Sequence, residues 1–152
     1  MSRLSVIVGA LALIGADAAA TRDRAMCERE QKRTVDGVRL TTQNCPVYVP
    51  KRLGYVPVVK FGNRSHEVGK LLKGGSVNWF VCQMHGASQR VTEGRYFNTW
   101  WALTLSDDGH RGWVNEVYFK GGRNDERDGG LRACQRADIR WGQSGRPDRA
   151  GR

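Results

Sequence analysis

Short apolar segments separated by turn residues are the feature that most limits what this chain can fold into. Between Cys45 and Phe119 they read "CPVYV", "YVPVVKF", "HEVGKLL", "SVNWFVCQ", "RYFNTWWALTL" and "RGWVNEVYF". Runs of this length that are rich in Val, Tyr, Phe and Trp and bounded by Gly, Pro or Asn are typical of strands. No window in this region keeps apolar residues at helical spacing over three turns. The pattern therefore predicts an all-β fold, a small barrel or sandwich.

Two connections carry residues that suit tight turns. Asp107-Asp108-Gly109 separates "WWALTL" from "RGWVNEV" and predicts a hairpin, and Lys73-Gly74-Gly75 separates the two preceding strands. The segment 84–98 is polar and contains two glycines, so we expect a longer excursion there. A Gly-rich loop, 120–134, follows the last predicted strand.

The first twenty residues predict a secretory signal peptide. Arg3 precedes an apolar run from Leu4 to Ala16, which is too short to cross a bilayer, and small residues follow it. Cleavage after Ala18 and cleavage after Ala20 both satisfy the small-x-small rule. We expect a secreted, extracellular protein that has no membrane segment once this peptide is removed.

The mature chain is strongly basic. The full sequence has 25 Lys and Arg against 15 Asp and Glu, and removing residues 1–20 deletes one base and one acid, so the net charge stays at +10. The basic residues gather near the two ends. They indicate a solvated surface or, alternatively, attraction to an anionic polymer that salt would weaken.

Four cysteines follow the predicted cleavage sites. An even number in an exported chain favours two disulfides, for which three connectivities are possible. We favour Cys27 with Cys45, which ties the charged N-terminal arm to the first strand, and Cys82 with Cys134, which closes the C-terminal end. Cys82 and His85 have ligand spacing, but no second pair completes a zinc site, so we expect no metal and no cofactor.

These features divide the chain into four parts. After the signal peptide (1–20) we expect a charged arm held mainly by its cysteine (21–44), one β domain (45–134) and a disordered basic tail (135–152). The arm has few large apolar residues, and Trp141 is the only aromatic residue of the tail.

The Trp100-Trp101 pair is expected to present one indole to each face of its strand. Trp101, Leu103 and Leu105 share one face by alternation, and if the leucines mark the interior, Trp100 points outward. We expect Trp79, Phe80, Trp101 and Trp113 to be packed in the core.

The order "WWALTL", turn, "GWVNEVYF" resembles the distal half of an SH3 domain. A Trp-Trp strand, a hairpin and a Gly-x-aliphatic-Pro-x-x-Tyr-aliphatic segment occur there, and Gly112, Val114, Tyr118 and Phe119 match this pattern in order. With "VPVVKFGNRSHEVGKLLKGGSVNWFVCQ" the chain is similar to bacterial SH3 (SH3b) domains of exported actinobacterial-type proteins. Asn115 replaces the groove proline, and "VPKRLGY" stands in place of the family's Arg-Ser-Gly-Pro turn.

The resemblance implies an SH3-like barrel with a groove for a ligand. Its aromatic residues would be Tyr48, Trp100 and Tyr118, with Asn115 beside them as a hydrogen-bonding amide. Flat aromatic rings stack on extended peptides or sugars at low entropic cost. The implied function is a non-catalytic, cell-wall-associated module, which we expect to be a monomer, that recognises peptidoglycan or an extracellular peptide.

Nothing in the sequence predicts an enzyme. His66, His85 and His110 are scattered over loop-like segments, and neither a nucleophile elbow nor a phosphate loop occurs. Two alternatives to the wall module remain. One is an inhibitor or effector that inserts the 84–98 excursion into a foreign protein, and the other is a polyanion binder that uses the basic termini.

Overall fold

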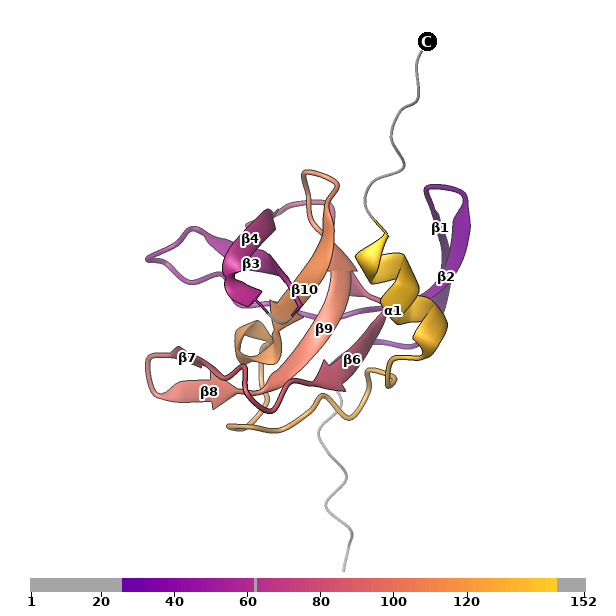
Figure 1. The fold of residues 1–152 in the computed structure, drawn as a ribbon. Coiled ribbons are helices and arrows are strands. Elements are labelled where there is room, and N and C mark those ends of the chain that lie inside the picture. Colours follow the sequence, from indigo (N-terminus) through magenta and orange to yellow (C-terminus); the bar gives the residue numbers. More distant parts are fainter. Residues whose placement is uncertain (1–25, 62, 145–152) are drawn as a thin grey trace, which may run out of the picture.

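The computed structural model describes residues 26–61 and 63–144, which form a β-rich fold with one short α-helix (Figure 1). The predicted signal peptide and residues 145–152 lie outside the described residues. None of the described helices is long and apolar enough to span a membrane. The elements in chain order are β1 (Gln31–Val35), β2 (Val38–Asn44), β3 (Tyr55–Lys60), β4 (Asn63–Leu72), β5 (Trp79–Phe80), β6 (Cys82–His85), β7 (Val91–Glu93), β8 (Tyr96–Asn98), β9 (Trp100–Leu105), β10 (Arg111–Asn115), the 3₁₀ helix η1 (Glu116–Tyr118) and α1 (Arg136–Gln143).

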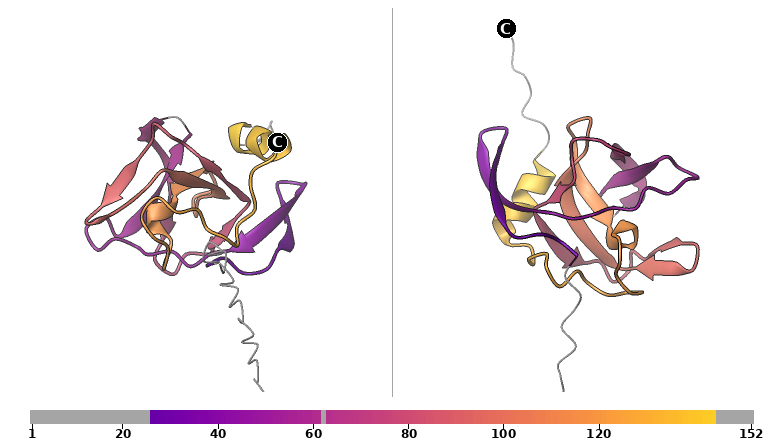
Figure 2. Two further views of the ribbon diagram at one scale, coloured as in Figure 1. Left: turned by 90° about the horizontal axis from the view of Figure 1, so that it is seen from below. Right: turned by 180° about the vertical axis from the view of Figure 1, so that it is seen from behind.

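The strands form three antiparallel sheets. The largest has the order β4-β3-β10-β9-β6, a second has the order β1-β2-β5, and β7 pairs with β8 alone. Figure 2 shows the β7–β8 hairpin at the opposite side of the molecule from the β1–β2 hairpin. No closed barrel is found among the described residues, because the five-stranded sheet has β4 and β6 as its edges.

Strand β9 is buried on both faces, which corrects the expectation that one face looks outward. Ala102 and Thr104 are 0% exposed, as is Leu103 on the opposite face. The Thr104 face lies toward β3 and β4, since its cross-strand partner Gly112 sits against Val58. The Leu103 face is covered by α1, where a Cβ on Gly142 would lie 2.6 Å from the Leu103 side chain. The leucines therefore mark the side of the sheet that the C-terminal helix covers.

The hairpin predicted at Asp107-Asp108-Gly109 is confirmed. It joins β9 to β10 in the register Arg111 opposite Leu105. The Asp107 carboxylate also accepts hydrogen bonds from the backbone N–H groups of Leu72 (2.7 Å) and Val77 (3.0 Å). Gly75 makes room for this carboxylate, because a Cβ at that position would overlap it. The turn thereby ties the end of the edge strand β4 to the centre of the sheet.

The N-terminal arm, which we expected to be held mainly by its cysteine, instead contains two paired strands. Its residues form the β1–β2 hairpin through a two-residue turn in which Asp36 and Gly37 have φ of 49° and 78°. Asp and Gly tolerate this left-handed conformation, which matches the twist of a tight hairpin. β2 then pairs with β5, so the arm becomes part of a sheet.

The expected disorder of the tail is also wrong for residues 136–143, which form α1. Arg132 binds both carboxylate oxygens of Asp138 in the first turn at 2.8 Å each. Arg111 of β10 lies over the Trp141 ring at 4.8 Å and donates to the carbonyl oxygens of Trp141 and Ser144. The Trp141 side chain is consequently 5% exposed.

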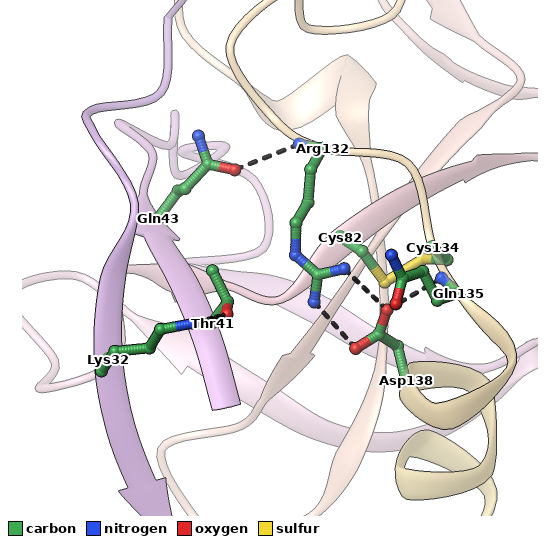
Figure 3. A network of polar contacts seen from close by, with 8 residues as sticks. All are labelled: Lys32, Thr41, Gln43, Cys82, Arg132, Cys134, Gln135 and Asp138. Atoms are coloured by element: carbon green, nitrogen blue, oxygen red, sulfur yellow. Dashed lines mark hydrogen bonds and ion pairs between the residues drawn. A yellow bond between two sulfur atoms is a disulfide. The ribbon is translucent and has the colours of Figure 1, made fainter. Parts of the chain in front are cut away.

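The two disulfides join Cys27 to Cys45 and Cys82 to Cys134, the pairing that the sequence analysis favours. Two buried glutamines, Gln43 and Gln83, hold the chain that leads to the second disulfide, and Figure 3 shows Gln43 with its bond to Arg132. Gln43 of β2 accepts from the Arg132 N–H and donates to the Gly130 carbonyl oxygen. Gln83 of β6 accepts from the Asp128 N–H and donates to the carbonyl oxygens of Asp128 and Leu131. These two side chains, together with the Gln83 backbone N–H that donates to the Arg132 carbonyl oxygen (2.8 Å), hold the segment 128–132.

Candidate functional site

Two cavities are lined in part by residues of the β7–β8 hairpin. The first, which we call the Tyr118 cavity, has a volume of about 370 Å³ and is lined by Pro57, Val59, Arg90, Val91, Thr92, Trp101, Asn115 and Tyr118. The second, the Tyr96 cavity, has a volume of about 510 Å³. Both volumes lie in the range of small-ligand sites.

The floor of the Tyr118 cavity is built by the end of β10, η1 and the start of β9. The indole N–H of Trp101 donates to the Gln89 carbonyl oxygen (3.1 Å), which orients the ring. A Cβ on Gly86 would lie 3.0 Å from the Trp101 ring, so the glycine lets the backbone pass close to the indole. Burial raises the pKa of the Tyr118 phenol above its ordinary value, and the charge of Glu93 adds to the effect. The phenol therefore stays protonated at neutral pH.

Asn115 shapes the wall between β10 and η1. Its Oδ1 accepts from the Val117 N–H (2.9 Å) and caps the 3₁₀ helix, and its Nδ2 donates to the Asn98 carbonyl oxygen (3.1 Å). The side chain is 1% exposed. A hydrogen bond from Asn115 to a ligand would have to use the second N–H of the amide.

The Tyr96 cavity has two tyrosine rings at its rim. Tyr48 and Tyr96 are 46% and 50% exposed, which is high for such large apolar groups. The Arg95 guanidinium lies 5.2 Å from the centre of the Tyr96 ring and donates to its hydroxyl group. Glu116 of η1 lies deeper in the same cavity.

Glu116 is the most perturbed acid among the described residues. Its Oε2 accepts from the Asp128 N–H (3.0 Å), whereas its buried Oε1 has no partner among these residues. Burial, together with the charge of Asp128, raises the pKa of Glu116 to about 8. The carboxyl group is therefore mainly neutral at pH 7 and has an O–H group to donate.

The four residues that the resemblance implied are not gathered in one cavity. Asn115 and Tyr118 line the Tyr118 cavity together, and Tyr48 lines the Tyr96 cavity. Trp100 lines neither of them. Its ring is half-buried and lies 5.1 Å from that of His85. Trp101 occupies the cavity position that the resemblance assigned to Trp100.

The histidines lie apart from both cavities. His85 is within hydrogen-bond distance of the Thr99 hydroxyl (2.9 Å), and Thr99 donates in turn to Asp125. His110 pairs with Asp108 at 3.3 Å, and His66 is exposed. Within the described ranges, no group of three or more His, Cys, Asp or Glu side chains is placed to hold a metal ion.

Sequence reasoning missed Trp101, Tyr96 and Glu116. Alternation assigned Trp101 to the core, and it is 2% exposed, yet one edge of its ring lines a cavity. Tyr96 and Glu116 carry no motif, and only the fold of the 120–128 loop makes Glu116 buried. Comparisons of this chain with protein-family models, with curated proteins and with solved structures find no match.

Proposed function

We propose that this chain is a secreted, non-catalytic binding module with an SH3-like arrangement, which holds an extended peptide in the Tyr118 cavity. The peptide would be the stem peptide of cell-wall peptidoglycan or another extracellular peptide. The observation that carries the proposal is the cavity itself, in which Trp101 and Tyr118 form a floor between Pro57 on one side and Val91 on the other. Peptides in extended conformation are often held against such aromatic floors.

The order of the elements supports the SH3-like arrangement. β6, β9 and β10 form an antiparallel meander, and η1 follows β10 directly. Beyond η1, Phe119 forms a bridge with Val47, which brings the first predicted strand beside the last. The resemblance implies the Trp-Trp strand, the hairpin and the segment from Gly112 to Phe119, which are β9, β10 and η1 in this succession.

Charge near the cavity supports a polar peptide as the ligand. Arg52 and Glu93 lie 3.7 Å apart, and both influence the pKa of the Tyr118 phenol, so they lie close to the cavity. The phenol can donate one hydrogen bond to a peptide carbonyl group. The two disulfides are consistent with an extracellular protein.

The experiment is co-sedimentation of the mature protein with purified cell-wall sacculi. Thr92→Trp fills the Tyr118 cavity from an exposed position and should reduce the bound fraction at least fivefold. Thr34→Trp, on the exposed face of β1, is the matched control and should bind like the wild type. Equal binding by both variants would show that the cavity is not the site.

The variant Trp100→Ala tests whether the ligand lies in the Tyr118 cavity or against the Trp100–His85 pair. If the ligand lies in the Tyr118 cavity, this variant should retain most of its binding, because Trp100 does not line that cavity. Loss of binding in Trp100→Ala with retention in Thr92→Trp would move the site to the Trp100–His85 pair.

A second candidate function is the binding of a foreign protein through the 84–98 excursion. The observation that favours it is the β7–β8 hairpin, which projects from the body of the molecule (Figure 1) and ends near the exposed Tyr96. A pull-down from culture supernatant that gives a stoichiometric protein partner, with no binding to sacculi, would favour this function.

A further inference from the structure

The lining of the Tyr96 cavity includes a glycine, Gly122, at a position where the backbone does not require one. Gly122 has a φ outside the left-handed region and could accept a Cβ with no atom within 4 Å. Neither conformation nor crowding explains a glycine there. With no side chain, the Gly122 backbone is open to close approach by a ligand.

Basic side chains surround this cavity. Arg95, Lys120 and Arg123 line it, together with the acids Glu93 and Glu116. Glu93 has an ion-pair partner in Arg52 at 3.7 Å, and Glu116 is mainly neutral at pH 7. The remaining charge is positive, so the cavity suits an anionic ligand.

Glu116 brings a buried hydrogen-bond donor to the lining of the cavity. The Oε2 atom of Glu116 is occupied by the Asp128 N–H, so the proton of the neutral acid resides on Oε1. Glu116 is 5% exposed, and Oε1 has no partner among the described residues. Because Oε1 has almost no accessible surface, a ligand oxygen reaches it only when the side chains around the buried end of the cavity shift slightly, and it then supplies the partner that this atom lacks.

We propose that the Tyr96 cavity is a second binding site, separate from the Tyr118 cavity, and that its ligand is an acidic sugar. The sugar ring stacks on Tyr96 or Tyr48, and its carboxylate faces the basic rim. A hydroxyl or acetamido oxygen accepts the hydrogen bond from Glu116. An acidic peptide fits less well, because the two exposed rings and one buried donor match a flat, oxygen-rich ring better than a flexible chain.

The test uses hyaluronan tetrasaccharide, which carries carboxylates and acetamido groups, and chitotetraose, which carries acetamido groups alone. Titration of the mature protein at pH 6.5 by calorimetry should give a Kd for the acidic probe at least tenfold below that for the neutral probe. Tyr96→Ala should raise the Kd for the acidic probe at least tenfold. Tyr55→Ala is the matched control, since Tyr55 also carries a cation over its ring (4.3 Å from Lys70) but lies outside the cavity.

Glu116→Gln separates a binding role of Glu116 from a structural one. The glutamine amide keeps both an acceptor for Asp128 and a donor toward the ligand, so this variant should bind at pH 6.5. In the wild type, binding should weaken as the pH rises from 6.5 to 9, because the carboxylate then repels the ligand. In Glu116→Gln this loss should disappear.

Other charged groups face Glu116 and belong in the interpretation of that profile. On the side of the 126–128 segment they are Glu126, Arg127 and Asp128. On the cavity side they are Glu93, Arg95, Lys120 and Arg123. All of them are kept in Glu116→Gln, so a pH dependence shared by wild type and variant would belong to these groups and would overturn the role given to Glu116.

Three outcomes would overturn the proposal of an acidic sugar. Equal affinity for the two tetrasaccharides would show that the cavity does not recognise the carboxylates of the ligand. Unchanged binding in Tyr96→Ala would place the ligand elsewhere. Competition by a poly-glutamate peptide at equal or lower concentration than hyaluronan would identify an acidic peptide as the ligand class.

Discussion

Replacing Glu116 by glutamine should change how the stability of this protein depends on pH. Burial raises the pKa of the folded-state carboxyl from 4.5 to about 8. Between these two values the unfolded chain has lost a proton that the folded chain still holds. The contribution of Glu116 to the free energy of unfolding is therefore fully present below pH 4.5, and it declines as the pH rises toward 8.

The size of the effect follows from the same two pKa values. The slope is at most about 1.4 kcal/mol per pH unit, and the interval from 4.5 to about 8 sets an upper limit of about 5 kcal/mol. Glutamine has a similar shape, keeps the acceptor for the Asp128 N–H and does not titrate. Relative to the wild type, Glu116→Gln should therefore gain stability progressively from pH 5 to pH 8.

Urea unfolding followed by tryptophan fluorescence at pH 5, 6, 7 and 8 measures this difference. Glu30→Gln, which removes an exposed carboxylate from the arm, is the control and should follow the wild type at every pH. If the free energies of wild type and Glu116→Gln run parallel over this range, the folded protein does not hold a proton on Glu116, and the donor assigned to the Tyr96 cavity would be lost with it.

Three further changes test how the fold is held together. Replacing Cys82 and Cys134 by alanine opens a crosslink between residues 52 positions apart and should lower the free energy of unfolding by about 4 kcal/mol, measured by urea unfolding; a loss below about 1 kcal/mol would contradict this. Trp141→Ala should cost about 3–5 kcal/mol and accelerate amide exchange throughout α1, whereas unchanged exchange there would show that the helix does not depend on this contact. Asp107→Ala leaves the N–H groups of Leu72 and Val77 without their acceptor and should lower stability by about 1–3 kcal/mol, while Asp107→Asn, which keeps one oxygen, should lose less.

The central hairpin and the disulfide pairing could be predicted because their signals are local or few. Asp107-Asp108-Gly109 lies between two alternating strands, and four cysteines allow only three pairings. The β1–β2 hairpin had an equally local signal in Asp36-Gly37, a two-residue hairpin turn between runs that contain Val and Thr. The high charge of the arm obscured that signal, because strand exteriors can be charged when only one face is buried.

The helix α1 and the buried Glu116 could not be predicted from local sequence. Trp141 is the one large buried side chain in α1. The helix is held by Arg111, which is distant along the chain, and by Arg132, which precedes the helix. The outward position of Trp100 was inferred from alternation on the premise that leucines mark the interior. The leucine face is buried under α1, but Ala102 and Thr104 on the opposite face are buried as well, so a buried leucine face did not imply an exposed face for Trp100.

The glutamine contacts join the two larger sheets through one segment of the chain. Gln43 belongs to the three-stranded sheet and Gln83 to the five-stranded sheet, and both bind the segment 128–132. That segment has no complete set of partners until both sheets have formed and met. During oxidative refolding we therefore expect the Cys82–Cys134 disulfide to form after the Cys27–Cys45 disulfide. Its formation should report that the three-stranded and five-stranded sheets have come together.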